Sequence, residues 1–271
     1  NTNTKILIIK EQGVGDEILY GSMYSEFLSK FPNSKIEADT RLISIFKRSF
    51  NNQNFVPLKK YSSNIKEIEN FETIIYAGSL GRLFRNNLRD FPKKHYLKIN
   101  PNINAKIQKK INIISNLPKI GIAWKSKREI LGNDKSINLE ILLPILKLKK
   151  FTFINLQYGD SDLEIQKFFE KRKINIHTIE NIDLFNDFES VASILRSLDL
   201  FITVSNSTTH LAGALGVRTW LIKPKEHAIF HYWLSLSNKT PWYNSIKMFQ
   251  HEEGWVKTIE KIKIDLLNLK I

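Results

Sequence analysis

The chain contains no cysteine, and this absence excludes two kinds of architecture. Without cysteine there is neither a disulfide framework nor a thiolate metal site. The 271 residues are enough to bury most of the apolar surface of a globular fold without such cross-links. A protein without disulfides also fits a reducing compartment, so we expect a cytoplasmic location.

Long apolar runs are missing as well. No stretch approaches the ~20 residues that a bilayer-spanning helix needs. Residues 5–9 (Lys-Ile-Leu-Ile-Ile) are too short for a signal peptide and predict a buried strand. There is no short-period repeat and no low-complexity tract. With 42% hydrophobic and 25% charged residues, the composition is that of a globular protein with one large or two ordinary domains.

Acidic residues are too few to balance the basic ones. The 41 Lys and Arg against 27 Asp and Glu give a formal net charge of +14, which attracts nucleic acid, anionic lipid or a phosphorylated substrate. However, the basic residues are spread along the chain, and its abundance of Lys, Asn and Ile is what drift toward AT-rich codons produces. We therefore expect no nucleic-acid partner. A peripheral contact with an anionic membrane, at its inner face, stays open.

Short apolar runs alternate with amphipathic stretches in the first half of the chain. This alternation of strands and helices predicts a parallel sheet covered on both faces. The predicted strands are Lys5–Lys10, Lys35–Ala38, Phe55–Leu58 and Thr73–Tyr76, and the predicted helices are Asp16–Phe31 and Leu42–Phe50.

The same alternation restarts after Pro118. Predicted strands are Lys119–Trp124, Thr152–Gln157, Ile174–Thr178, Leu200–Val204 and Thr219–Ile222; predicted helices are Leu139–Leu146, Asp162–Arg172, Ser190–Ser197 and Thr208–Leu215. We therefore place an N-terminal domain at residues 1–110 and a second domain at 118–254. Residues 255–271 hold an amphipathic helix that can pack on either domain.

The first candidate motif is a glycine turn between a strand and a helix. It contains Gly13, Gly15 and Asp16. The glycines allow a tight turn and close approach by a ligand. The third glycine of the dinucleotide-binding fingerprint is missing, and an acid at the helix start would repel a pyrophosphate. Asp16 therefore fits a general base beside an acceptor hydroxyl, or simply the cap of its helix.

A second motif follows the strand that begins at Lys119. The strand leads into a loop that carries Lys125 and Ser126, and residues 133–137 continue it with Lys135 and Ser136. Ligands of open α/β sheets bind beyond the carboxyl ends of strands, so these residues are candidates for phosphate binding. An ordinary solvated loop explains them equally well.

A cluster of small polar residues forms the third motif. After the strand at 200–204 come Ser205, Asn206, Ser207, Thr208 and Thr209. Their hydroxyl groups and the free amides of a helix start would bind an anion, and one helix cap does not need four hydroxyls. The next residue, a histidine at position 210, is by itself more often a satisfied core residue than a ligand.

Taken in order, these segments resemble a known family. They are E-Q-G-V-G-D, G-I-A-W-K-S and S-N-S-T-T-H-L-A-G-A-L-G, with further support from 78–84, Tyr96-Leu97, 241–243 and Met248-Phe249. The whole is similar to the glycosyltransferase-like domain at the C-terminus of many bacterial tetratricopeptide-repeat proteins. That domain in turn resembles the heptosyltransferases (glycosyltransferase family nine) that build lipopolysaccharide cores.

The resemblance implies a GT-B-like α/β fold: two Rossmann-like domains around an interdomain cleft, with no metal and no cofactor. It makes Asp16 the general base. It matches Lys125 and the helix start at 207–209 to groups that hold the donor diphosphate, and His210 to the histidine of that segment. Combined with the second and third motifs, this gives an expected donor site in the second domain: Lys125, Ser126, Lys135, Ser205, Asn206, Ser207, Thr208, Thr209 and His210. The expected substrates are a nucleotide-diphosphate-sugar donor and a glycan, lipid-linked or protein acceptor.

Ser205 departs from the family pattern, because heptosyltransferases usually carry aspartate there. We therefore keep two functional hypotheses. The first is a metal-independent, inverting glycosyltransferase that acts on a hydroxyl acceptor. The second is a catalytically idle GT-B module that binds a glycan, a nucleotide or a protein partner. A nucleotide-sugar epimerase would need more acidic residues in the cleft than the sequence offers.

Overall fold

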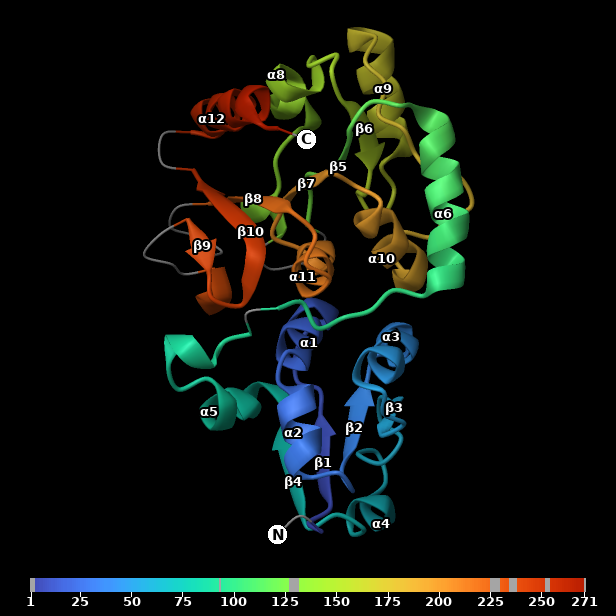
Figure 1. The fold of residues 1–271 in the computed structure, drawn as a ribbon, viewed down its shortest axis with the longest axis vertical. Helices are drawn as coiled ribbons and strands as arrows, with labels where there is room; N and C mark the ends of the chain where they lie inside the picture. The colour runs from blue at the N-terminus through green and yellow to red at the C-terminus, as the bar shows by residue number, and fades with distance from the viewer. Residues whose placement is uncertain are drawn as a thin grey trace.

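A computed structural model describes residues 3–92, 94–126, 132–224, 230–233, 238–251 and 254–270. The molecule is elongated, with one sheet and its helices at each end of the long axis (Figure 1). The N-terminus lies at the far end of the first unit, and the C-terminus lies in the second. The two sheets show that there are two units, but they do not determine at which residues the units begin and end. The division into residues 1–110 and 118–254 therefore stays a prediction.

The first sheet has four parallel strands in the order β3-β2-β1-β4. These are β1 (Ile6–Ile9), β2 (Lys35–Ala38), β3 (Phe55–Pro57) and β4 (Thr73–Tyr76). The register places Leu7 of β1 opposite Lys35 of β2 and Ile74 of β4. The helices of this unit are α1 (Val14–Gly21), α2 (Tyr24–Lys30), α3 (Thr40–Phe50), α4 (Ile65–Ile68), η1 (Ala77–Leu80), α5 (Gly81–Phe84) and η2 (Leu88–Asp90).

The second sheet has six strands in the order β6-β5-β7-β8-β10-β9. They are β5 (Lys119–Ala123), β6 (Thr152–Asn155), β7 (Leu200–Val204), β8 (Thr219–Lys223), β9 (Lys239–Thr240) and β10 (Tyr243–Gln250). All pairs are parallel except that of β9 with β10. Because parallel strands are covered on both faces, they form continuous buried runs, as β7 and β8 do.

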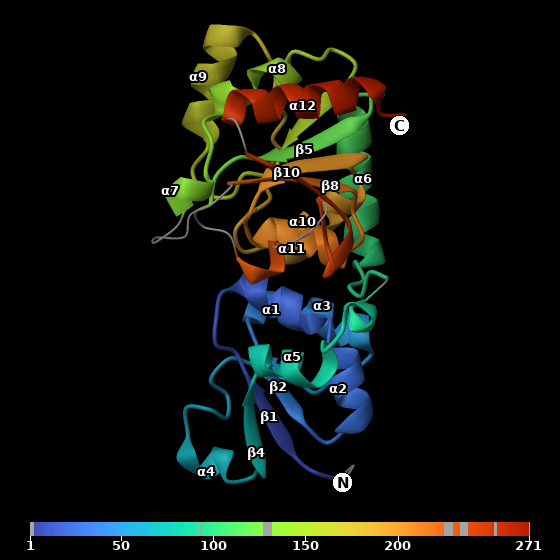
Figure 2. The ribbon, with the colours of Figure 1, turned by 90° about the vertical axis from the view of Figure 1, so that its left-hand side faces the viewer.

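Helices cover both faces of the second sheet (Figure 2). They are α6 (Pro101–Ile114), α7 (Gly132–Lys135), η3 (Leu139–Leu142), α8 (Leu143–Leu146), α9 (Asp162–Arg172), α10 (Phe188–Arg196), α11 (Ser207–Ala214), η4 (His231–Trp233) and α12 (Trp255–Asn268). The helix α6, which begins within the predicted N-terminal domain, packs against α10 of the second unit. The C-terminal helix α12 packs on α8, η3 and β10, and thus on the second unit.

Three of the differences from the sequence-based expectation have a clear structural reason. The helix predicted at 16–31 is divided, because the amides of Ser22 and Met23 bond to carbonyl groups three residues back and tighten one turn. The strand predicted at 174–178 forms a single bridge at His177, after which the chain turns at 180–181. The strand β10 was not predicted, because its mixed burial pattern lacks the continuous apolar run of the other strands.

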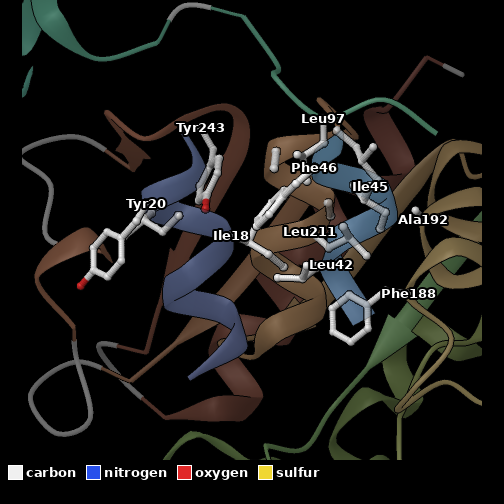
Figure 3. Close-up of a cluster of buried hydrophobic side chains, with 14 of the residues drawn as sticks. Ile18, Tyr20, Leu42, Ile45, Phe46, Leu97, Phe188, Ala192, Leu211 and Tyr243 are labelled. Carbon is white, nitrogen blue, oxygen red and sulfur yellow. The ribbon is translucent and has the colours of Figure 1, made fainter. Parts of the chain in front are cut away.

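A single cluster of buried side chains joins the two units. It extends from Ile18 and Phe46 in the first unit to Leu211, Phe188 and Tyr243 in the second (Figure 3). A separate cluster fills the other face of the second sheet, under α8 and α12. The helix α1 lies directly on α11 at the junction. The interface between the units is therefore hydrophobic, and it fixes how the first-unit residues face the second.

Candidate functional site

A cavity of about 290 Å³ lies where the two units meet. It opens at the N-terminal ends of α1 and α11, one helix from each unit. Both helices follow a parallel strand, so the cavity lies outside the carboxyl ends of β1 and β7, the usual ligand position in such sheets. Its walls are formed by Gly13, Val14, Gly15, Asp16, Arg41, Ser126, Lys135, Tyr158, Leu184, Phe185, Phe188, Ser205, Asn206, Ser207, His210 and Tyr232.

Asp16 lies in the first turn of α1 and lines the cavity. Gly13, not Asp16, occupies the N-cap position of this helix. The alternative in which Asp16 is merely the N-cap is therefore wrong. The residue is 5% exposed, and its carboxyl group stands at the positive end of the α1 dipole, which stabilises the ionised form.

Gly15 allows α1 to approach α11 closely. A Cβ atom at this position would lie 2.9 Å from Cδ2 of His210 and 3.3 Å from Cα of Ser207. Only glycine fits between the two helices at this distance. Gly15 is therefore needed for the close contact between the units, and not for a turn of the backbone. The two glycines of the first motif thus serve different purposes, because Gly13 caps the helix.

The start of α11 presents polar groups to the cavity. Asn206 is the N-cap, and its side-chain oxygen accepts a hydrogen bond from the amide of Thr209 at 3.0 Å. Ser207 is the first helical residue and lines the cavity together with Asn206. The hydroxyl oxygen of Ser205 accepts a hydrogen bond of 2.8 Å from the indole of Trp233. The start of α11 therefore lies at the cavity, and binding of an anion by its first-turn amides stays a prediction.

Two predicted donor-binding residues of α11 do not reach the cavity wall. Thr208 and Thr209 are buried, and neither is among the lining residues. The Thr209 hydroxyl donates to the carbonyl group of Val204 at 2.8 Å. The Thr209 hydroxyl therefore points into the protein, and neither threonine forms part of the wall that a ligand in the cavity would contact.

The structure brings Lys135, and not Lys125, to the cavity. The Lys125 amine forms a 2.6 Å salt bridge with Glu164 on α9, outside the cavity wall. Lys135 is 4% exposed, and its amine lies 4.9 Å from the centre of the Phe230 ring. Ser126 lines the cavity beside it, and its amide is held by the hydroxyl of Ser136 at 3.0 Å.

Sequence reasoning missed the wall contributed by Arg41 and the segment before α10. The Arg41 guanidinium makes two 2.8 Å hydrogen bonds to the carboxylate of Asp39 and donates to the carbonyl group of Phe185 at 3.1 Å. Arg41 therefore ties the first unit to the loop that carries Leu184 and Phe185. Its place directly after β2 is the one signal that points to it, because the carboxyl ends of strands β1 and β2 lie side by side.

His210 is enclosed in a ring of aromatic side chains. It stacks on Trp233 with ring centres 5.0 Å apart, and Tyr232 meets it edge-on at 4.8 Å. Its Nδ1 lies 3.0 Å from the hydroxyl of Tyr243. Burial, together with the nearby charges of Lys135 and His231, lowers the pKa of His210 to about 3. The imidazole is therefore neutral at physiological pH.

The lowered pKa of His210 predicts a loss of stability in acid. The unfolded chain takes up a proton near pH 6.5 and the folded chain only near pH 3, so the free energy of unfolding falls as the pH drops between these values. One such group contributes a slope of up to ~1.4 kcal/mol per pH unit. Urea denaturation of the wild type and His210→Gln from pH 7 to pH 4 measures this. We expect a shallower decline in the variant, and equal slopes would contradict the assignment.

Within residues 3–92, 94–126, 132–224, 230–233, 238–251 and 254–270, no three His, Asp or Glu side chains gather as metal ligands. Over those residues, none of the helices combines the length and the apolar character that a membrane span requires.

No family model matches the chain. A curated relative, Protein FlbA of Caulobacter vibrioides (strain ATCC 19089 / CIP 103742 / CB 15), is 27% identical over 275 residues. The match covers 95% of this chain but 45% of that protein, so the chain spans less than half the length of this relative.

Solved structures show the fold. The ADP-heptose lps heptosyltransferase II of E. coli superposes with a TM-score of 0.66 at 11% identity, over 98% of this chain and 99% of that chain. A family 9 glycosyl transferase from Veillonella parvula DSM 2008 gives 0.64 at 12% identity, over 97% of both chains. The iron-containing dodecameric glycosyltransferase TibC of enterotoxigenic E. coli gives 0.54 at 12% identity, over 98% of this chain and 77% of TibC. The predicted α/β fold of GT-B type is thus confirmed.

Proposed function

We propose that the chain is a glycosyltransferase that moves a sugar from a nucleotide-diphosphate donor to a hydroxyl acceptor. One observation carries the proposal: an acidic side chain on α1 and the amide-rich start of α11 face the same cavity from different units. A base and an anion site on opposite walls are what transfer from a diphosphate leaving group requires. The likeness to heptosyltransferase structures supports the fold on which this site is built.

In this proposal the reaction is a single displacement with inversion. Asp16 takes the proton of the acceptor hydroxyl while that oxygen attacks the anomeric carbon of the donor sugar. The bond from the anomeric carbon to the diphosphate breaks, and the nucleoside diphosphate leaves with the bonding electrons. General-base assistance of this kind contributes ~10²–10⁴-fold to the rate.

The leaving diphosphate is held by groups of the second unit. The first-turn amides of α11, at Ser207, give a site for phosphate oxygens, and the hydroxyl groups of Ser126 and Ser207 line the same wall. Lys135 supplies the positive charge there. Because these groups already offset the charge that develops on the diphosphate, we propose that the reaction proceeds without a metal ion.

Lys135 is expected to contribute to donor binding. Replacing it with methionine keeps an unbranched apolar side chain at this buried position but removes the charged amine that lies over the Phe230 ring. We expect nucleoside-diphosphate affinity to fall roughly tenfold or more, the scale of a charged hydrogen bond. Isothermal titration calorimetry with ADP measures this affinity for the wild type and for Lys135→Met.

Lys125→Met is the matched control, because the Lys125 amine is bound to Glu164 outside the cavity wall. A loss of affinity in Lys125→Met with none in Lys135→Met would exchange their roles and restore the sequence-based assignment of Lys125 to the diphosphate.

A second candidate function is a binding module without turnover. Ser205 stands where heptosyltransferases usually carry aspartate, so this position has no negative charge. Its hydroxyl oxygen accepts a hydrogen bond from the Trp233 indole. Such a module would hold a nucleotide, a glycan or a protein partner in the same cavity. The predicted link to tetratricopeptide repeats, the cytoplasmic location and the contact with an anionic membrane stay predictions.

Donor hydrolysis separates the two candidates. A thermal-shift screen of nucleoside diphosphates and their sugars first identifies the donor that stabilises the protein. The stabilising nucleotide-sugar is then incubated with the protein without acceptor, with and without EDTA. We expect slow release of nucleoside diphosphate that EDTA does not reduce. Binding without release indicates the module, and release abolished by EDTA would refute metal independence.

A further inference from the structure

Arg41 is a cation on the wall of the cavity, and the proposed reaction assigns it no role. It lies in the first turn of α3, shortly after β2, and lines the cavity together with Asp16. Its side chain is 22% exposed, so a ligand in the cavity can reach it. Arg41 therefore places a positive charge on the first-unit wall, whereas the groups proposed for the diphosphate belong to the second unit.

The guanidinium of Arg41 is held along one edge. Its Nε and Nη2 donate to the two carboxylate oxygens of Asp39, each at 2.8 Å, and its Nη1 donates to the carbonyl oxygen of Phe185 at 3.1 Å. A guanidinium carries five N–H groups. In the part of the chain that the structure describes, these bonds use three of them. One N–H on Nη1 and one on Nη2 are left for a ligand.

The groups around this guanidinium are fixed as well. Asp39 is the N-cap of α3, and its own amide donates to the carboxyl group of Glu17 at 2.8 Å. The guanidinium carbon lies 5.3 Å from the centre of the Phe185 ring and 5.2 Å from that of the Phe188 ring. A guanidinium that is already oriented loses little further conformational freedom when it binds an anion.

Asp39 does not neutralise the charge around Arg41. The hydrogen bonds from Arg41 lower the pKa of Asp39 to about 2, so this carboxylate is ionised. It is shared by a second cation, because the Lys10 amine lies 3.4 Å from its Oδ2. Burial raises the pKa of Glu17, the other carboxyl group beside Lys10, to about 7, so Glu17 carries only part of a negative charge at neutral pH. The cluster of these four side chains thus keeps a partial positive charge, which attracts an anion.

Asp16 limits which anion fits beside Arg41. Both side chains line the cavity from the first unit, so Asp16 repels the negative charge that Arg41 attracts. This repulsion grows with the charge of the ligand, and it is stronger for a diphosphate than for a single carboxylate. A carboxylate also matches the planar geometry of guanidinium N–H groups. Because the diphosphate has its proposed site at α11, a carboxylate on a sugar fits this position better.

We propose that Arg41 is a specificity-determining residue that binds a carboxylate on one of the two sugar substrates. That the ligand is a sugar rests on the proposed function, whereas the negative charge that the ligand carries follows from Arg41 and its surroundings. The site would thus select an acidic sugar over a neutral sugar of the same shape.

Titration with free sugars tests this proposal before the donor is known. Glucose and glucuronate differ only in the group at one carbon, which is hydroxymethyl in glucose and carboxylate in glucuronate. Galactose and galacturonate form a second such pair. The Nε–H signal of Arg41 in ¹H–¹⁵N NMR spectra, identified by its loss in Arg41→Lys, reports binding. We expect a uronate, but not its neutral partner, to shift this signal saturably. If neither uronate shifts it in the wild type, the proposal is overturned.

Arg41→Lys keeps the charge but loses the planar fork, so we expect uronate affinity to fall roughly tenfold or more. Arg48→Lys is the matched control. Arg48 also lies on α3 and bonds through its guanidinium to a carboxylate, that of Glu189, and to the carbonyl group of Lys98, but it lies outside the cavity wall. We expect wild-type uronate affinity in this control. Equal losses in both variants, or none in Arg41→Lys, overturn the proposal. Should Arg41→Lys not fold, Arg41→Gln takes its place with the same expectation.

Competition with nucleotides shows which substrate carries the carboxylate. A uronate that binds together with ADP-glucose occupies the acceptor position, because the neutral sugar of ADP-glucose then fills the donor position. A uronate that ADP-glucose displaces and ADP does not displace occupies the position of the transferred sugar. If Arg41→Lys instead loses affinity for ADP and pyrophosphate, Arg41 belongs to the diphosphate site and the proposal is overturned.

The same titrations separate this inference from the proposed function. Uronate binding at Arg41 by a protein that binds no nucleotide supports the carboxylate site and contradicts the glycosyltransferase. Nucleotide binding and donor turnover without any uronate binding contradict the carboxylate site alone.

Discussion

Sugar-transfer turnover is expected to fall by ~10²-fold or more when Asp16 is replaced with asparagine. Asparagine keeps the shape of the side chain and its hydrogen-bonding oxygen but removes the basicity. The carboxylate lines the cavity at the start of α1, opposite the proposed diphosphate site on α11. Since the change affects only proton transfer, donor affinity and melting temperature should stay close to the wild-type values.

The matched control for this variant is Glu11→Gln. Glu11 lies in the same loop but outside the cavity wall, and its Oε1 accepts from the amide of Gly78, a bond that glutamine retains. Its turnover should equal that of the wild type. An Asp16→Asn protein that unfolds but leaves its folded fraction fully active would make Asp16 a structural residue. A wild type that turns over no donor would favour the binding module.

A second large effect is expected at Gly15. The added methyl group of Gly15→Ala would press on His210, whose ring is fixed between Trp233 and Tyr232, and on the backbone of Ser207. Overpacking of this kind costs about 1–3 kcal/mol in unfolding free energy. It also shifts α1 relative to α11, and a displacement of ~1 Å between reacting groups lowers turnover by up to ~10²-fold.

Urea denaturation and steady-state turnover measure these two consequences. Gly81→Ala serves as the comparison, because a Cβ atom at Gly81 meets nothing within 4 Å. We expect Gly81→Ala to match or slightly exceed the stability of the wild type, since alanine restricts the unfolded chain. If Gly15→Ala were as stable and as active as Gly81→Ala, the close contact between the helices would not matter to either property.

Local sequence patterns predicted most strands and helices because buried parallel strands and amphipathic helices leave signals within a few residues. Asp162–Arg172 and Leu200–Val204 have the predicted bounds. The divided helix after Asp16 was not predictable, because a tightened turn at Ser22 and Met23 leaves the apolar spacing nearly unchanged. The strand β10, which lies between β8 and β9, lacked a continuous apolar run and was missed.

The site was harder to predict because side-chain direction depends on distant partners. Lys125 and Lys135 look equivalent in sequence. What separates them is Glu164 on α9, which holds the Lys125 amine at 2.6 Å. Likewise, the surroundings of His210 depend on Tyr232, Trp233 and Tyr243, which no local pattern connects to it. The polar cluster after β7 did predict the start of a helix, because a helix start is a local feature.

The hydrophobic cluster shared by the two units has a consequence for folding. Interfaces between domains of one chain are usually polar enough for each domain to fold alone. Here Ile18, Phe46, Leu211 and Tyr243 belong to one buried cluster, so neither half can cover its apolar surface without the other. The chain should therefore unfold in one cooperative thermal transition. Either half expressed by itself should expose a hydrophobic surface and aggregate.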